Sequence, residues 1–198
     1  MCKKRVLLRF LSILFVAAFF AGCAGMAAKP TESNFQAPVV TLDNMEVAHA
    51  FGYWYFSSKV APTKGKPDNV GAPLDLAFTF NVENPNPFPV QMESLKFSVL
   101  FEEFELNTVS THATQWIPPG MTNQVLVHAH FDVRQSLLSL LVTGGFKLKE
   151  KGTNAWAALE KWWTGIPNYE VPVTVSGGAA VFKADSLVKV STFEATFP

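Results

Sequence analysis

The sequence is poor in cysteine and in charged residues. Its 198 residues include two cysteines, and only 16% of the side chains are charged. Low charge together with 18 phenylalanines excludes an intrinsically disordered chain, because such chains are rich in charge and poor in aromatic residues. No basic run occurs beyond residue 22, so no nucleic-acid partner is expected.

The zero net charge hides an uneven distribution. The first 22 residues hold no acidic side chain and four basic ones, which are Lys3, Lys4, Arg5 and Arg9. The remaining 176 residues carry 12 basic and 16 acidic side chains, a net charge of −4, and their number suits one domain. The basic start is followed by a mostly apolar run over residues 6–21. A positive segment before a short apolar one is typical of a secretory signal and is too short to span a bilayer comfortably.

The apolar run ends in Phe20-Ala21-Gly22-Cys23, which resembles the bacterial lipobox. In that pattern small residues precede a cysteine that becomes the lipidated first residue, and two or more acyl chains give stable membrane anchoring. Phe20 stands where leucine is usual. The resemblance implies lipidation at Cys23 after removal of residues 1–22, and Ala24 implies sorting to the periplasmic side of an outer membrane in a Gram-negative host. The alternative is an ordinary secretory signal in which Cys23 is incidental.

Removal of the signal takes Cys2 away and leaves a single, lipidated cysteine. No second thiol then remains for a disulfide, a zinc site or a catalytic nucleophile. The segment 24–38 is small, polar and flanked by proline, which predicts a flexible tether over residues 23–38 and a folded domain over residues 39–198.

Alternation of apolar and polar residues predicts a mainly β domain. Leu74, Leu76, Phe78 and Phe80 alternate with polar or small residues, which is typical of a half-buried strand. Similar strands are predicted over residues 39–47, 95–101, 104–106, 125–131, 171–182 and 187–197, with a rigid turn at residues 117–120 and a proline-rich loop over residues 57–73. Short antiparallel strands with turns between them predict a sandwich of the immunoglobulin or fibronectin-III type.

One or two short helices interrupt the strands. Asp132 predicts the start of the first, with apolar residues at helical spacing and a left-handed stop at Gly144. The second is predicted over residues 155–164, capped by Thr153 or Asn154 and ended by Gly165.

A rigid corner is predicted at Asn84-Pro85-Asn86-Pro87-Phe88. Proline cannot donate to a β ladder, and asparagine side chains bond to nearby backbone, so the motif ends one strand and turns Phe88 inward. In its context, between the alternating strand 78–82 and the alternating strand 95–99, the motif resembles the type-two late-embryogenesis-abundant family, also called the water stress and hypersensitive response (WHy) domain. The resemblance implies a non-enzymatic sandwich associated with desiccation and other stress. The Trp-rich helix does not match the family pattern.

Other constellations predict no reaction and no cofactor. His128 and His130 share one face of a strand and could hold a metal only with a further ligand such as His112, so no metal site is predicted. Glu102, Glu103 and Glu105 are expected to be solvated at a turn. Neither Gly-x-Ser-x-Gly nor His-Glu-x-x-His occurs, and no catalytic residue is predicted.

Two functions remain open for this chain. In the first, a lipoprotein holds a rigid sandwich at the cell envelope and acts in stress tolerance through binding or protective contacts. In the second, the same anchored domain docks on an envelope protein complex through a sheet edge or its Trp-rich helix. A possible partner surface comprises Trp156, Trp162 and Trp163, with Trp162 near the surface. The alternative is that these rings pack in the core.

Overall fold

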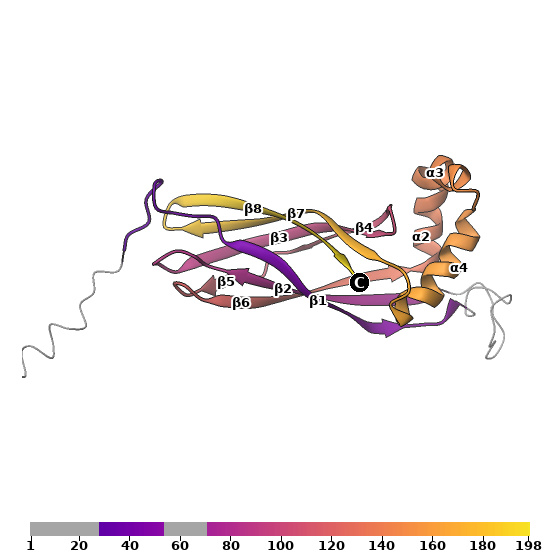
Figure 1. Cartoon of the computed structure of the whole chain (residues 1–198), viewed down its shortest axis with the longest axis horizontal. Helices are drawn as coiled ribbons and strands as arrows, with labels where there is room; N and C mark the ends of the chain where they lie inside the picture. The colour runs from indigo at the N-terminus through magenta and orange to yellow at the C-terminus, as the bar shows by residue number, and fades with distance from the viewer. Residues whose placement is uncertain (1–27, 54–70) are drawn as a thin grey trace, which may run out of the picture.

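The chain folds as a sandwich of two antiparallel sheets with helices at one end, as a computed structural model of residues 28–53 and 71–198 shows (Figure 1). This confirms the predicted mainly β sandwich. The first sheet has the order β1-β2-β6 and the second has the order β4-β3-β7-β8, with β5 also paired to β3. The strands are β1 (Val39–Ala50), β2 (Pro73–Glu83), β3 (Val90–Phe101), β4 (Phe104–Thr111), β5 (Gln115–Ile117), β6 (Thr122–Asp132), β7 (Val173–Ala184) and β8 (Leu187–Phe197).

The alternating side chains of the facing strands meet in an aromatic core. Phe78 and Phe80 of β2 both contact the ring of Phe97 of β3 edge to face, at 5.3 Å and 5.1 Å between centroids. Phe193 of β8 packs on Phe80 at 5.2 Å. All four rings are buried, and burying one phenylalanine stabilises a fold by about 1.5–3 kcal/mol. The period of two in the sequence therefore locates the interface between the sheets.

Both open sides of the sandwich are closed by contacts between edge strands. Asn107 of β4 donates its side-chain amide to the His130 carbonyl of β6 at 2.9 Å. On the other side the Ser191 hydroxyl of β8 donates to the Pro38 carbonyl just before β1. Free strand edges favour pairing with other chains, and these cross-sheet bonds occupy part of two of them.

The first helical stretch begins where expected and runs further than expected. Asp132 caps α2 (Val133–Ser139) by accepting a hydrogen bond from the Arg134 amide at 2.9 Å. The predicted left-handed stop at Gly144 is wrong: its φ is −97°, and the chain continues through the π-helical turn η2 (Leu140–Gly144) into α3 (Gly145–Glu150). A Cβ at Gly144 would stand 3.1 Å from the Leu140 side chain and 3.4 Å from the Phe104 ring, so the position is closely packed.

The second helix, α4 (Ala155–Gly165), agrees with its prediction. Asn154 caps it by accepting from two amides, and the 3-10 turn η3 (Ile166–Asn168) follows. Both Trp162 and Trp163 are buried, and the Trp163 indole donates to the Ala72 carbonyl at 2.7 Å. The expectation that Trp162 lies near the surface is therefore wrong. Its ring packs on Phe101 and Phe104, and its indole nitrogen donates to Glu102 at 3.2 Å.

The two ends of the sandwich differ. The helices lie at one end, and the N-terminal segment enters at the other (Figure 1). β2 joins these ends over 11 residues, which corresponds to about 35 Å in an extended strand. Among the described residues no helix is long and apolar enough to cross a membrane.

The sequence predicts a bulge at Gly177-Gly178, because glycine inside a strand commonly marks one. The structure confirms it, since the pairing of β7 with β8 shifts between Val175 and Gly178. We predict that Gly178→Ala lowers the free energy of unfolding by about 1–3 kcal/mol, since its Cβ would stand 2.5 Å from both the Phe193 ring and its backbone oxygen. Chemical denaturation measures this. The matched control is Gly145→Ala, which meets open space in a helical conformation and should be neutral or stabilising by up to about 1 kcal/mol. Equal effects of the two substitutions would contradict the packing described.

Glu102 joins the β3–β4 turn to α4. Its partial burial raises the pKa of the carboxyl, but hydrogen bonds from Lys161 and Trp162 and the positive charges of Lys161 and Lys151 outweigh this and leave the pKa below its ordinary value. A carboxyl with a lowered pKa stabilises the fold above its unfolded pKa, and this contribution is lost as the pH falls through the folded one.

We therefore predict that Glu102→Gln destabilises the protein at neutral pH and that the difference from the natural chain shrinks below about pH 4. Denaturation curves recorded across this range measure the difference. A difference that stays constant with pH would show that the charge of Glu102 does not stabilise the fold.

Candidate functional site: the asparagine–proline corner

Asn84 is completely buried at the point where β2 ends. Its side-chain amide donates to three backbone carbonyls, those of Phe88 at 2.9 Å, Ile117 at 3.0 Å and Pro118 at 3.1 Å. Its backbone amide donates to the Met121 carbonyl at 2.9 Å. One side chain therefore holds the corner against the turn between β5 and β6.

Asn86 continues the network from Asn84 to the N-terminal segment. Its backbone amide and its side-chain amide both donate to the Asn84 side-chain oxygen, at 3.0 Å and 2.8 Å. Its side chain also bonds both polar groups of the Gln36 backbone: the Gln36 amide donates to it at 2.7 Å, and the Gln36 carbonyl accepts from it at 2.8 Å. Asn86 thus pairs with Gln36 as a neighbouring strand would.

The prolines fit this arrangement because the alternation of the strand continues through the corner. Asn84, Asn86 and Phe88 are buried, whereas Pro85 and Pro87 between them are exposed. A proline ring on the outside costs no hydrogen bond, since proline has no amide to satisfy. Among the described residues no buried side-chain nitrogen or oxygen is left without a partner. The corner is rigid as predicted, and asparagine supplies its hydrogen bonds.

The segment before β1 is part of the folded domain. The Phe35 ring is buried and packs edge to face on Phe88, with 6.1 Å between centroids. Before it, the Thr31 amide donates to the Asn34 side chain at 2.8 Å, which forms a capped turn. The predicted flexible tether over residues 23–38 is therefore wrong from Thr31 onward. The sequence does not point to Gln36, because Asn86 binds its backbone and not its side chain. The isolated aromatic residue Phe35 was the one available signal that this segment packs on the domain.

The two strand histidines share a carboxylate. Both His128 and His130 place Nδ1 against Asp75, at 3.2 Å and 3.3 Å, and their rings stack at 6.1 Å. They lie on one face, as expected, but His112 is not among their partners in the described structure. Asp75 lies on the neighbouring strand β2, where the pairing of β2 with β6 sets it opposite His130. Within residues 28–53 and 71–198 no group of three or more His, Cys, Asp or Glu side chains is placed to hold a metal ion.

The proposed aromatic partner surface does not form. Trp162 and Trp163 are buried in the core, and Trp156, at 52% exposure, is the most exposed of the three. The turn carboxylates are also occupied, because Glu102 pairs with Lys161 and Glu103 pairs with Lys151. Cys23, Trp54 and Tyr55 and most of the proline-rich loop lie outside the described residues.

The corner contains amides and carbonyls and is suited to holding segments together. No titratable side chain takes part in the Asn84–Asn86 network, which joins β2, the β5–β6 turn and the N-terminal segment. The arrangement can position the N-terminal segment at one end of the sandwich, and it offers no group for acid–base or nucleophilic chemistry.

No model of a known protein family matches the chain, and no curated protein matches it. Two solved structures are similar in fold. One is the crystal structure of a protein from Archaeoglobus fulgidus, with 11% identity over 79% of this chain and 94% of that chain and a TM-score of 0.40. The other is the X-ray structure of the Northeast Structural Genomics Consortium target SoR45, with 8% identity over 81% of this chain and 86% of that chain and a TM-score of 0.44.

Asn84→Ala tests the network directly. We predict that this change lowers the free energy of unfolding by about 3 kcal/mol, because it removes the buried side-chain donor of the Phe88 and Ile117 carbonyls and the acceptor of both Asn86 amide groups. The matched control is Asn81→Ala, whose side chain bonds Asp43 at the surface and whose loss should stay within about 0.5 kcal/mol. Urea denaturation measures both, and a loss at Asn84 no larger than that at Asn81 would contradict the assigned role.

Proposed function

We propose that this chain is a non-enzymatic, lipid-anchored protein of the bacterial envelope, whose sandwich is held close to the membrane and acts in stress tolerance through contacts. The lipobox-like Phe20-Ala21-Gly22-Cys23 supports the anchor. The resemblance of the Asn-Pro-Asn corner to the WHy pattern supports the role in desiccation or envelope stress. An outer membrane facing the periplasm is the expected location.

The observation that supports the proposal most directly is the contact in which the Asn86 side chain binds both polar groups of the Gln36 backbone, called the Gln36 clamp below. The N-terminal segment is bound to the corner by both polar groups of the Gln36 backbone and by the Phe35 ring. Only four residues separate Cys23 from Ala28, and a fully extended chain over these five steps reaches about 18 Å. An anchor at Cys23 would therefore keep the corner end of the sandwich near the bilayer surface.

The alternative function, docking on an envelope protein complex, is less well supported because two residues of the expected partner surface, Trp162 and Trp163, are buried in the core. We therefore favour a protective module over an assembly partner.

Cys23→Ala separates the anchor from the fold. We expect the natural chain to float with membranes and to yield an N-terminal peptide that begins at an acylated Cys23, and we expect Cys23→Ala to lose both properties. Mass spectrometry of the purified protein and membrane flotation measure this. Asn81→Ala is a control that leaves the lipobox intact. An unmodified Cys23 in the natural protein would overturn the anchor.

The stress role needs a separate measurement. Cells that lack the protein should survive drying or osmotic shock less well, and the natural chain should restore survival where Cys23→Ala does not. Equal survival with and without the protein would contradict the proposed role while leaving the anchor untouched.

A further inference from the structure

An exposed apolar surface lies on the continuous α2–η2–α3 stretch. Phe146 is 88% exposed and Val142 is 82% exposed, and Leu138 and Leu141 are exposed by 65% and 59%. These four side chains are spaced at three and four residues, with Leu141 and Val142 adjacent, so they share one side of the helix. Large apolar side chains that gather on one helix face mark an interaction surface.

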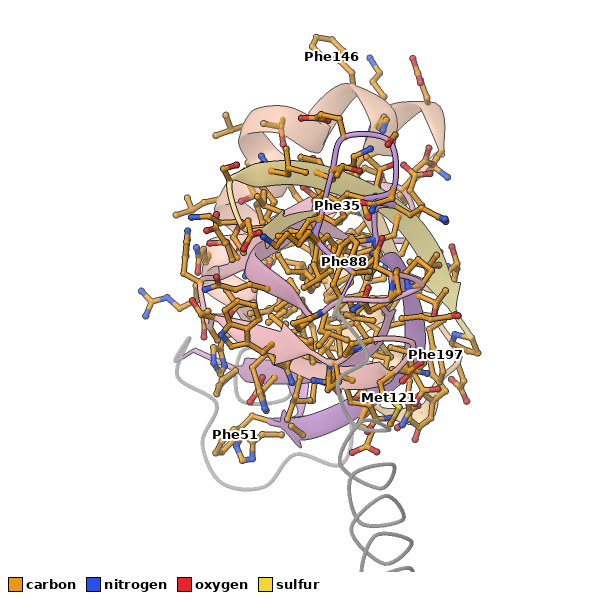
Figure 2. All side chains as sticks on the ribbon, turned by 90° about the vertical axis from the view of Figure 1, so that its left-hand side faces the viewer. Phe35, Phe51, Phe88, Met121, Phe146 and Phe197 are labelled. Carbon is orange, nitrogen blue, oxygen red and sulfur yellow. The ribbon has the colours of Figure 1, made fainter. Side chains whose placement is uncertain are left out.

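This surface protrudes on the side of the molecule toward which the turn of the N-terminal segment also projects. In Figure 1 that turn and α3 rise at opposite ends beyond the sheet that contains β8, and the indigo trace descends from the turn to the start of the described segment. In Figure 2 Phe146 is the outermost labelled side chain on this side. β8 runs between these two projections. Its Phe193 side chain points into the core, and because side chains alternate along a strand, Val188 and Val190 point outward and are exposed.

The charged residues of the stretch itself are mainly basic, although Glu105 of β4 lies beside Leu138 and Val142. Lys147 and Lys149 lie in the last turn of α3, and Glu150 is the single acid within residues 133–151. The Lys147 amine donates to the Glu103 carbonyl at 3.3 Å. The rest of the mature chain is acidic overall, so this basic character is local. Lysine beside exposed phenylalanine, leucine and valine on a helix is typical of a helix that lies in a membrane interface.

We propose that the α2–η2–α3 stretch makes a second contact with the bilayer that carries the anchor, with Phe146 and Val142 among the acyl chains and Lys149 at the headgroup phosphates. This inference rests on the proposed lipid anchor. With four residues between Cys23 and Ala28, an extended chain of five steps holds Ala28 within about 18 Å of the bilayer, and the helix at the other end projects on the same side as the turn of the N-terminal segment. The sandwich then lies along the membrane surface, attached at both ends.

A fluorophore at residue 146 tests the contact. The mature chain has no free thiol once Cys23 is acylated, so Phe146→Cys offers one site for an environment-sensitive dye. The lipidated full-length protein is placed in vesicles of phosphatidylethanolamine with one quarter phosphatidylglycerol. We expect the dye emission to shift to shorter wavelength and to lose its quenching by aqueous iodide. The matched control is Leu126→Cys, an exposed leucine on β6 of the other sheet, where the dye should remain quenched.

The outcomes separate this inference from the proposed anchor. A protein that floats with the vesicles while the dye at residue 146 stays as quenched as the dye at residue 126 overturns the second contact and keeps the anchor. A dye at residue 146 that becomes protected only in native envelopes also overturns it, because the surface then meets a protein. A protein that does not float overturns the anchor, and the inference falls with it.

Discussion

The buried pair Asn84 and Asn86 is the constraint on which the architecture of one end of the molecule depends. A primary amide without partners is costly in a protein interior, so both side chains fix every group that they touch. Those groups come from segments far apart in the sequence: Gln36 near the N-terminus, Phe88 in the corner, and Ile117 and Pro118 before β6. A side chain of the same size without an amide could not join them.

The same network explains why proline and asparagine occur together here. Proline stiffens the crossing between the sheets and removes amides that the corner could not satisfy, while asparagine replaces the strand pairing that ends at Glu83. Phe88 then packs inward and covers Phe35. Through this sequence of contacts a local motif positions the segment that would carry an anchor, at the end of the sandwich opposite the helices.

Much of the fold was predictable because its signals are local. Alternation located β2, β3 and β6, the Asp132 cap located the start of α2, and the double glycine located a bulge in β7. The errors concern long-range contacts. The chain continues as a helix through Gly144, which packs beside Leu140 and Phe104, and Trp162 is buried because Phe101 and Phe104 come from a distant hairpin. In the candidate site the asparagines were predictable, but Gln36 was not, since its side chain plays no part in the clamp.

Amide hydrogen exchange at Gln36 tests the central claim most directly, because that amide donates to the Asn86 side chain and no strand ladder protects it. We predict slow exchange at Gln36 in the natural protein. In Asn86→Ala we predict fast exchange at Gln36 and unchanged protection in the β3–β7 pair. Exchange at Gln36 as fast as in an unstructured peptide, in the natural protein, would contradict the claim that the corner holds the N-terminal segment.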